Sequence, residues 1–128
     1  MDDTRIEALV RESLERDHLH TFDDCIRMLH SGEAHIFQND HGCWIVQIVE
    51  SKLVKSCHVW VVAGELPGVL DLEPLVEAFA RENGCTIMTS ICRYGYGKRI
   101  AKERNWTITG LSVEKPIPPA HAQPHTQT

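Results

Sequence analysis

The chain has 128 residues, of which 42% are hydrophobic and 24% charged, so its length and composition suit one globular domain with its own core. A formal net charge of -5 argues against general attraction to nucleic acid or to anionic membranes. No apolar run approaches the roughly 20 residues of a membrane-spanning helix, and the acidic N-terminus does not look like a secretory signal. We therefore expect a protein that stays in a cytosol or in a particle assembled there, with no nucleic-acid or membrane partner.

Two helices are expected at the start of the chain. Thr4 with Glu7 three residues later forms a capping-box pattern, and apolar residues at helical spacing predict a helix over residues 4–18. Thr21 is expected to cap a second, shorter helix, which Gly32 ends.

Three strands should follow as an antiparallel meander. The pattern predicts strands over 33–38, 43–50 and 53–63, with a turn at 39–42 in which Gly42 can take a positive φ. The second and third strands are apolar on both faces, so we expect them to lie centrally with cover above and below.

The second half of the chain predicts a strand–helix–strand crossover. Residues 64–70 read as a loop, and Asp71 is expected to cap a helix that stops at Asn83-Gly84. The remaining elements, in order, are a strand over 85–91, a glycine-punctuated junction over 93–97, a short basic helix over 98–105 and a last strand over 106–113.

This element order defines the expected fold class. It is α+β, with a mixed, mostly antiparallel twisted sheet and helices on both faces, because the meander pairs antiparallel and the crossover pairs parallel. We expect a domain over residues 1–113 and a Pro/His-rich C-terminal arm over 114–128, which by composition is disordered or polyproline-like.

Three stretches carry a resemblance to a known family. The first joins residues 20–24 with residues 34–37, and the second covers residues 59–65. The third runs over residues 80–87 and 93–96 to Asn105-Trp106, where the family usually has Gly-Trp. Over about residues 4–113 the chain resembles the GNAT (GCN5-related N-acyltransferase) superfamily, and more closely the short GNAT-like proteins encoded among bacteriophage structural genes. The resemblance implies a GNAT-like fold, acetyl-CoA as the cofactor of any enzyme activity, other phage structural proteins as partners, and location in a virion or host cytoplasm.

The loop between the long strand and the central helix departs from the family pattern. An active GNAT enzyme has Gln/Arg-x-x-Gly-x-Gly/Ala here, whose backbone N–H groups cradle the cofactor pyrophosphate. This chain retains two glycines, Gly64 and Gly68, as the candidate cofactor-binding residues, while Glu65 and Asp71 add carboxylates and Pro67 removes a donor. We therefore predict a degenerate acyl-CoA loop and no cofactor; the alternative is acetyl-CoA binding through an unusual loop.

The resemblance also suggests catalytic residues, should the chain be an enzyme. Glu65 stands where a general base can sit, and Tyr94 and Tyr96 where such enzymes hold a general acid. The alternative is that Glu65 lies in water and the tyrosines pack at a strand–helix corner.

A basic cluster offers a contact surface. Its members are Arg93, Lys98, Arg99, Lys102 and Arg104. One interpretation is a surface that binds an anion or an acidic partner. The other is a solvated helix face whose cations lie near the C-terminal end of the helix. The acidic remainder of the chain argues against nucleic acid.

Cysteines and histidines indicate neither disulfides nor a metal site. The odd number of cysteines predicts reduced, mostly buried thiols at Cys25, Cys43, Cys57, Cys85 and Cys92. Cys92 beside Arg93 could instead have a lowered pKa and act as a nucleophile. The eight histidines form no HExxH pattern, so we predict no metal.

Three functions follow from these observations. The first is a GNAT-like domain with a degenerate acyl-CoA loop, non-catalytic, serving as a phage virion or assembly component through protein contacts and compatible with an oligomer. The second is an acetyl-CoA-dependent N-acyltransferase. The third is a host-directed binding protein that mimics an acyltransferase.

Overall fold

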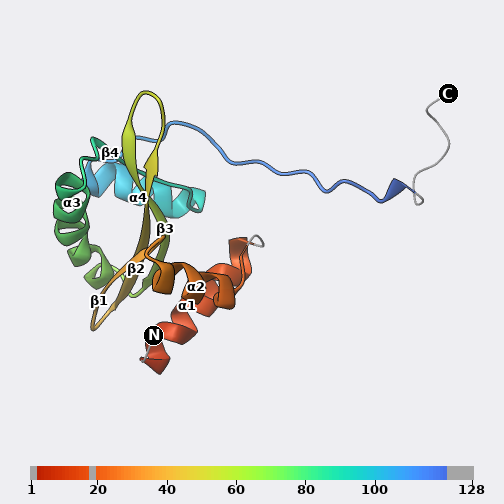
Figure 1. The fold of residues 1–128 in the computed structure, drawn as a ribbon, viewed down its shortest axis with the longest axis horizontal. Coiled ribbons are helices and arrows are strands. Elements are labelled where there is room, and N and C mark those ends of the chain that lie inside the picture. Colours follow the sequence, from red (N-terminus) through yellow and green to blue (C-terminus); the bar gives the residue numbers. More distant parts are fainter. Residues whose placement is uncertain (1–2, 18–19, 121–128) are drawn as a thin grey trace. The chain divides into compact units, whose positions relative to one another are not determined.

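A four-stranded sheet in the order β1-β2-β3-β4 organises the first part of the chain (Figure 1). The computed structural model describes residues 3–17 and 20–120. The elements in chain order are α1 (Thr4–Asp17), α2 (Phe22–Ser31), β1 (His35–Asn39), β2 (Gly42–Glu50), β3 (Lys55–Gly64), the 3-10 helix η1 (Gly68–Leu72), α3 (Glu73–Glu82), β4 (Ile87–Ser90) and α4 (Tyr94–Arg104).

The sheet is mixed, as the sequence predicts. β1 pairs antiparallel with β2, β2 pairs antiparallel with β3, and β3 pairs parallel with β4. Helices cover both faces: α1 and α2 share a buried core with one face, while ring contacts between α3 and β1 lie on the other (Figure 1). The expected α+β class with a mixed sheet is therefore confirmed.

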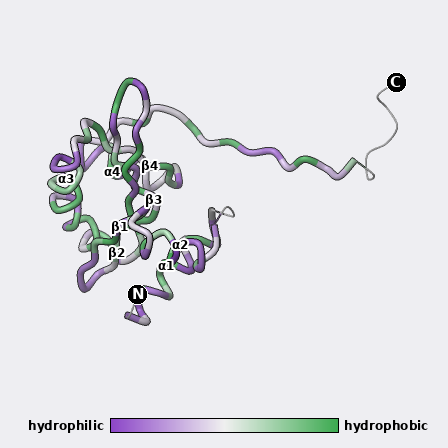
Figure 2. Tube along the Cα trace, viewed as in Figure 1, coloured by the Kyte–Doolittle hydropathy of each residue, from purple (hydrophilic) through white to green (hydrophobic). Residues whose placement is uncertain are grey.

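The core of the α1/α2 face comes from regularly spaced apolar residues. Ile6, Val10 and Leu14 recur every four residues on α1, and all three are buried. They pack in one cluster with Cys25 of α2 and with inward residues of β2 and β3. Burying such an aliphatic side chain contributes about 1.5–3 kcal/mol. Figure 2 shows hydrophobic residues along the central strands, where this burial occurs.

The two N-terminal helices begin differently from each other. The Asp3 carboxylate accepts hydrogen bonds from the backbone N–H groups of Arg5 (2.9 Å) and Ile6 (3.3 Å), so Asp3 caps α1 and the predicted cap at Thr4 is wrong. The predicted end at residue 18 lies outside the described residues.

At α2 the predicted cap is confirmed. The Thr21 hydroxyl accepts from the Asp24 N–H at 3.1 Å, and the Asp24 carboxylate accepts from the Thr21 N–H at 3.0 Å. Gly32 ends the helix with a φ of 84°.

Strand boundaries differ slightly from the predicted ones. The first strand starts at His35 rather than at residue 33, the third at Lys55 rather than 53, and β4 is shorter than the predicted 85–91. Gly42 takes a positive φ, as predicted, and pairs with Gly64 across the β2–β3 ladder. A Cβ on either glycine would lie 2.7 Å from the Cα of the other, so this pair permits an approach that no other residue allows.

The chain divides after Ile91 into two compact units, and each is considered by itself. In the second unit α4 begins at Tyr94, so the junction predicted over 93–97 is wrong: Gly95 and Gly97 are helical. Asn105 ends α4 at a φ of 64°, a left-handed conformation that asparagine tolerates better than most residues.

The last predicted strand does not form. Over residues 92–120, the described part of the second unit, no strand is present, and residues 105–119 have no regular structure. The arm boundary at residue 113 stays a prediction, and residues 121–128 lie outside the described chain. No helix among the described residues is long and apolar enough to cross a membrane.

Candidate functional site

The strands β3 and β4 separate midway along β3. They pair only from Ser56 opposite Ile87 to Val59 opposite Ser90, although β3 continues to Gly64. The Ser90 hydroxyl donates to the Val59 carbonyl oxygen at 3.1 Å, at the last paired position. Beyond this position no described strand lies on that side of β3. The carboxyl-terminal half of β3 therefore presents a backbone edge to which an extended ligand can hydrogen-bond.

A β-bulge lies at the same position. Ile45 pairs with Val61 and the next residue, Val46, pairs with Val59, so Trp60 is an extra residue on β3. A bulge increases the local twist and re-aims the strand. The half-buried Trp60 ring meets the His20 ring edge-on, with their centroids 4.9 Å apart. The bulge thus lies one residue beyond Val59, the last position at which β3 pairs with β4.

The segment that joins β3 to α3 is the one expected to hold a cofactor. Three of its backbone N–H groups donate within the protein: Glu65 to the His41 carbonyl, Val69 to the Glu65 carbonyl and Leu70 to the Pro67 carbonyl, each at 2.9 Å. Pro67, which follows a cis peptide bond, has no N–H. These four positions therefore offer no free N–H donor to a phosphate group.

The space beside Gly68 is also filled. A Cβ on Gly68 would overlap the ring of His41, from the turn between β1 and β2. The Asn39 side-chain amide, in the same turn, donates to the Gly68 carbonyl at 3.0 Å. In a phosphate-binding loop glycine lets the ligand approach the backbone. Here the lack of a side chain at Gly68 lets the His41 ring pack against it instead.

Trp44 anchors the next residue of this segment. Its indole Nε1 donates to the Val69 carbonyl at 2.8 Å, and both residues are about 1% exposed. The loop is thus held to the sheet through Asn39, His41 and Trp44. Sequence reasoning did not select these three residues; the Asn-Asp-His-Gly turn indicated only that a hairpin lies there.

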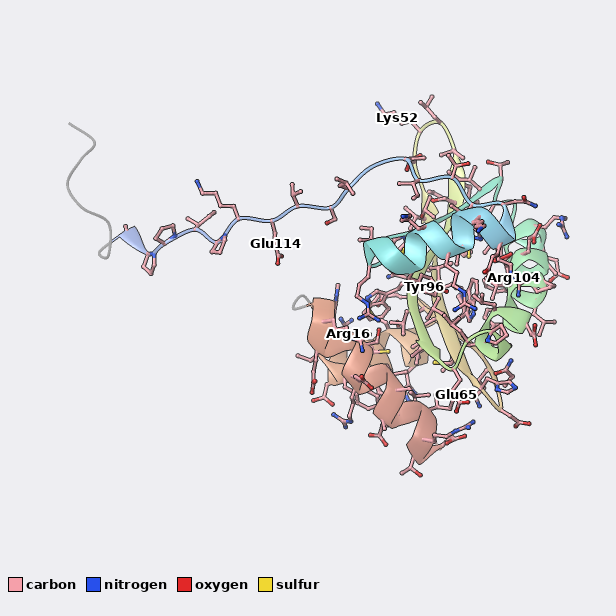
Figure 3. The ribbon with its side chains drawn as sticks, turned by 180° about the vertical axis from the view of Figure 1, so that it is seen from behind. Arg16, Lys52, Glu65, Tyr96, Arg104 and Glu114 are labelled. Carbon is pink, nitrogen blue, oxygen red and sulfur yellow. The ribbon has the colours of Figure 1, made fainter. Side chains whose placement is uncertain are left out.

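The charges around this segment are negative. Glu65 and Asp71 are exposed, and Glu73 lies in the first turn of α3 (Figure 3 labels Glu65). Asp71 falls inside η1 and the N-cap of α3 is Leu72, so the predicted cap at Asp71 is wrong. Carboxylates near a helix N-terminus stabilise the helix but repel a phosphate.

The candidate acid and base lie in different units. Glu65 follows β3, whereas Tyr94 is the first residue of α4 and Tyr96 is half-buried in its first turn. The pairing of Glu65 with a tyrosine stays a prediction.

The basic cluster lies mostly on α4. Lys98, Arg99 and Lys102 are exposed, as is Arg93 before the helix. Lys98 and Lys102 are four apart and share a helix face, while Arg99 forms an ion pair with Glu103 at 3.3 Å.

The cysteines are free thiols, and three of them are buried. Burial raises the pKa of Cys25 and Cys57 to about 11 and that of Cys43 to about 12. Cys92 is exposed, yet desolvation raises its pKa too, so the predicted lowering by Arg93 is wrong.

His58 makes a contact that sequence reasoning missed. Its Nδ1 lies 3.0 Å from the Thr89 hydroxyl, across the β3–β4 pair, and desolvation lowers its pKa. Among residues 3–17 and 20–120, no group of three or more His, Cys, Asp and Glu side chains could hold a metal ion.

Comparison with known proteins supports the fold. No protein-family model and no curated protein sequence matches the chain. Among solved structures, one described as "Putative acetyl transferase from Pyrococcus furiosus" matches with a TM-score of 0.62. The alignment covers 89% of this chain and 93% of that chain at 18% identity. At this identity the similarity concerns the fold, which is acetyltransferase-like and consistent with a GNAT-like domain.

Proposed function

We propose that this chain is a GNAT-like domain that works through protein contacts, as a virion or assembly component of a bacteriophage, and not by acyl-CoA chemistry. The phage assignment rests on the sequence resemblance. The non-catalytic part rests on one observation, the construction of the segment 64–72 between β3 and α3.

This segment does not fit a pyrophosphate. Such a group is held by several backbone N–H donors at a helix N-terminus, in a field that favours negative charge. Here the N–H groups of Glu65, Val69 and Leu70 donate to carbonyls of the same chain. The His41 ring packs where a phosphate would approach Gly68, and Asp71 adds a nearby carboxylate.

Contacts with other proteins would use two exposed features of the second unit. One is the basic surface of α4, which suits an acidic partner. The other is the irregular segment after α4, where exposed apolar side chains collect at Ile108, Leu111, Val113 and Ile117. Exposed apolar residues that gather in one segment indicate an interaction site better than scattered ones do.

Calorimetry with acetyl-CoA and with free CoA tests the non-catalytic part. We expect no binding at micromolar concentrations, because the N–H groups of Glu65, Val69 and Leu70 already donate within the chain and Pro67 has none. The matched variant is Pro67→Glu, which adds a carboxylate beside Gly68 at an exposed position. Micromolar binding that this variant weakens would overturn the proposal and place the cofactor in the loop.

Association with particle proteins tests the phage role. Purified particles or assembly intermediates should contain the protein, and on a sizing column it should elute with other structural proteins. A protein that is absent from particles and always elutes alone would contradict this role. Binding to host proteins instead would favour the host-directed alternative.

An acetyl-CoA-dependent N-acyltransferase is the second candidate. The separation of β3 from β4 after Val59 favours it, because the exposed strand edge suits an extended amide-containing chain. In this case Glu65 would be the general base and Tyr94 or Tyr96 the general acid. Acetyl transfer to an amine that Glu65→Gln abolishes, with acetyl-CoA binding unchanged, would support this candidate over the first.

A further inference from the structure

β1 forms one edge of the sheet and pairs on one side only, with β2 (Figure 1). Both faces of this strand are held by the first unit. On one face the rings of His35 and Phe37 contact the Phe79 ring of α3, with centroids 4.8 and 5.2 Å apart. On the other face Ile36 packs against the buried cluster that includes residues of α1 and α2. The outer edge of β1 is therefore fixed in position before any partner binds.

A hydrogen bond at the start of β2 determines which backbone groups of β1 face outward. The His41 carbonyl accepts from the Glu65 N–H at 2.9 Å, so the backbone of His41 faces β3. Because this direction alternates along a strand, the backbone of Trp44, three residues later, faces β1. Phe37 pairs with Trp44 in the register, so the backbone N–H and carbonyl of Phe37 face β2.

The neighbours of Phe37 consequently face away from β2. The backbone N–H and carbonyl groups of Ile36 and Gln38 point outward, to a side where no strand among the described residues pairs with β1. At Ala34, the outward position before Ile36, the N–H donates to the Met28 carbonyl at 3.0 Å. Ile36 and Gln38 thus each offer a donor and an acceptor at this edge.

The edge also lacks the usual protection against pairing. Edge strands normally carry charged residues, prolines or bulges that prevent association. Residues 35–39 contain no proline and no Asp, Glu, Lys or Arg. The register of β1 with β2 runs without a bulge, and the charged Glu33 and Asp40 lie beyond its two ends. The edge can therefore accept another strand along its whole length.

The outward groups are arranged symmetrically about Phe37, so the edge is complementary to itself. When two β1 strands run antiparallel about a two-fold axis at Phe37, Ile36 of each chain lies opposite Gln38 of the other. Each such pair exchanges two hydrogen bonds, which uses the outward donors and acceptors of both residues. A register centred on Ile36 would need the N–H of Ala34, which is already used. One centred on Gln38 would need Asp40, which lies in the turn.

We propose that the chain forms a two-fold dimer in which the β1 strands pair antiparallel about Phe37 and join the two four-stranded sheets. The two Phe37 side chains meet at the axis, where opposed Cβ atoms are about 4.5–5.5 Å apart and an aromatic pair is favourable. The contact is closed, because each chain covers the β1 edge of the other. The ladder is short, so the dimer is weak. It uses the first unit alone and depends neither on acetyl-CoA nor on the phage role.

Sedimentation of the full chain at concentrations up to about 1 mM tests the proposal. The edge variant is Gln38→Pro, which removes an outward N–H, keeps the pairing with β2 and replaces an exposed side chain. Each dimer loses half of its intermolecular ladder, so its dissociation constant should rise by about tenfold or more. Gln38→Ala is the matched control: it removes the same side chain but keeps the N–H, so the constant should change by less than about threefold.

Hydrogen exchange shows whether this edge forms the contact. The amides of Ile36 and Gln38 should exchange quickly in dilute samples and slowly in concentrated ones, whereas the Phe37 amide is protected in both. If Gln38→Pro unfolds the protein, Gln38→Lys replaces it, because it places a charge of each chain on the shared edge. A chain that stays monomeric up to about 1 mM, or a dimer that the edge variant does not weaken, would overturn the proposal. Protection of Ile36 and Gln38 at every concentration would overturn it as well, because the edge would then be covered within one chain.

Discussion

Trp44 should decide whether the segment 64–72 stays closed, and Trp44→Phe tests this directly. The substitution removes the indole donor and leaves the buried Val69 carbonyl without its 2.8 Å hydrogen bond. An unsatisfied buried carbonyl costs about 1–3 kcal/mol. The smaller ring leaves unfilled volume worth about 1 kcal/mol more at ~24 cal/mol per Å³. The free energy of unfolding should therefore fall by about 2–4 kcal/mol, a large share of the ~5–15 kcal/mol of a typical domain.

Urea unfolding measures this loss, and hydrogen exchange locates it. A decrease of about 3 kcal/mol lowers the urea midpoint by about 1–3 M. Val46→Ala is the matched control, because it removes buried volume from the same strand without touching the hydrogen bond to η1. Only Trp44→Phe should speed the exchange of the Val69 and Leu70 amides by local opening. A loss below about 1 kcal/mol, or equal exchange in both variants, would refute the claim that Trp44 holds this segment.

Three further predictions concern other parts of the first unit and the thiols. Gly64→Ala should lower the free energy of unfolding by about 2 kcal/mol or more, because its Cβ would lie 2.7 Å from the Gly42 Cα; a neutral change in urea unfolding would contradict the register. His58 has a pKa below 6.5 in the folded chain, so protonation favours the unfolded chain and stability falls as pH drops below about 6.5. His58→Asn should reduce this loss in unfolding curves at pH 7.5 and 5.5, and an unchanged pH dependence would exclude His58 as its source. The exposed thiol of Cys92 should react with a disulfide reagent much faster than the buried Cys43, whose pKa is about 12, and equal rates would contradict the burial.

Local sequence patterns determined the elements that need no distant partner. The Thr21 cap and the Gly32 stop of α2 are interactions within a few residues, and both could be read directly. The continuous apolar runs of β2 and β3 indicated strands covered on both faces, and the sheet places helices there. The order of elements fixed the antiparallel and parallel pairings.

Some elements were mispredicted because competing local signals are close in energy. Asp3 and Thr4 are adjacent, and either side chain could cap α1. In the structure the Asp3 carboxylate is the cap, and the Thr4 hydroxyl is not. Gly95 and Gly97 were read as a break before the last helix. A glycine costs a helix only about 1 kcal/mol, so two of them weaken α4 without ending it.

The residue types of the candidate site could be predicted from the sequence, but the contacts that hold the segment in place could not. The sequence by itself showed that Gly64–Asp71 lacks the family's glycines and carries carboxylates. Only the tertiary structure placed the His41 ring against Gly68 and the Trp44 indole on the Val69 carbonyl, because these contacts join segments more than 20 residues apart. The missing last strand has the same physical cause. Residues 107–113 have a strand-forming sequence, but a strand exists only when a second edge accepts its hydrogen bonds, and local sequence cannot specify that edge.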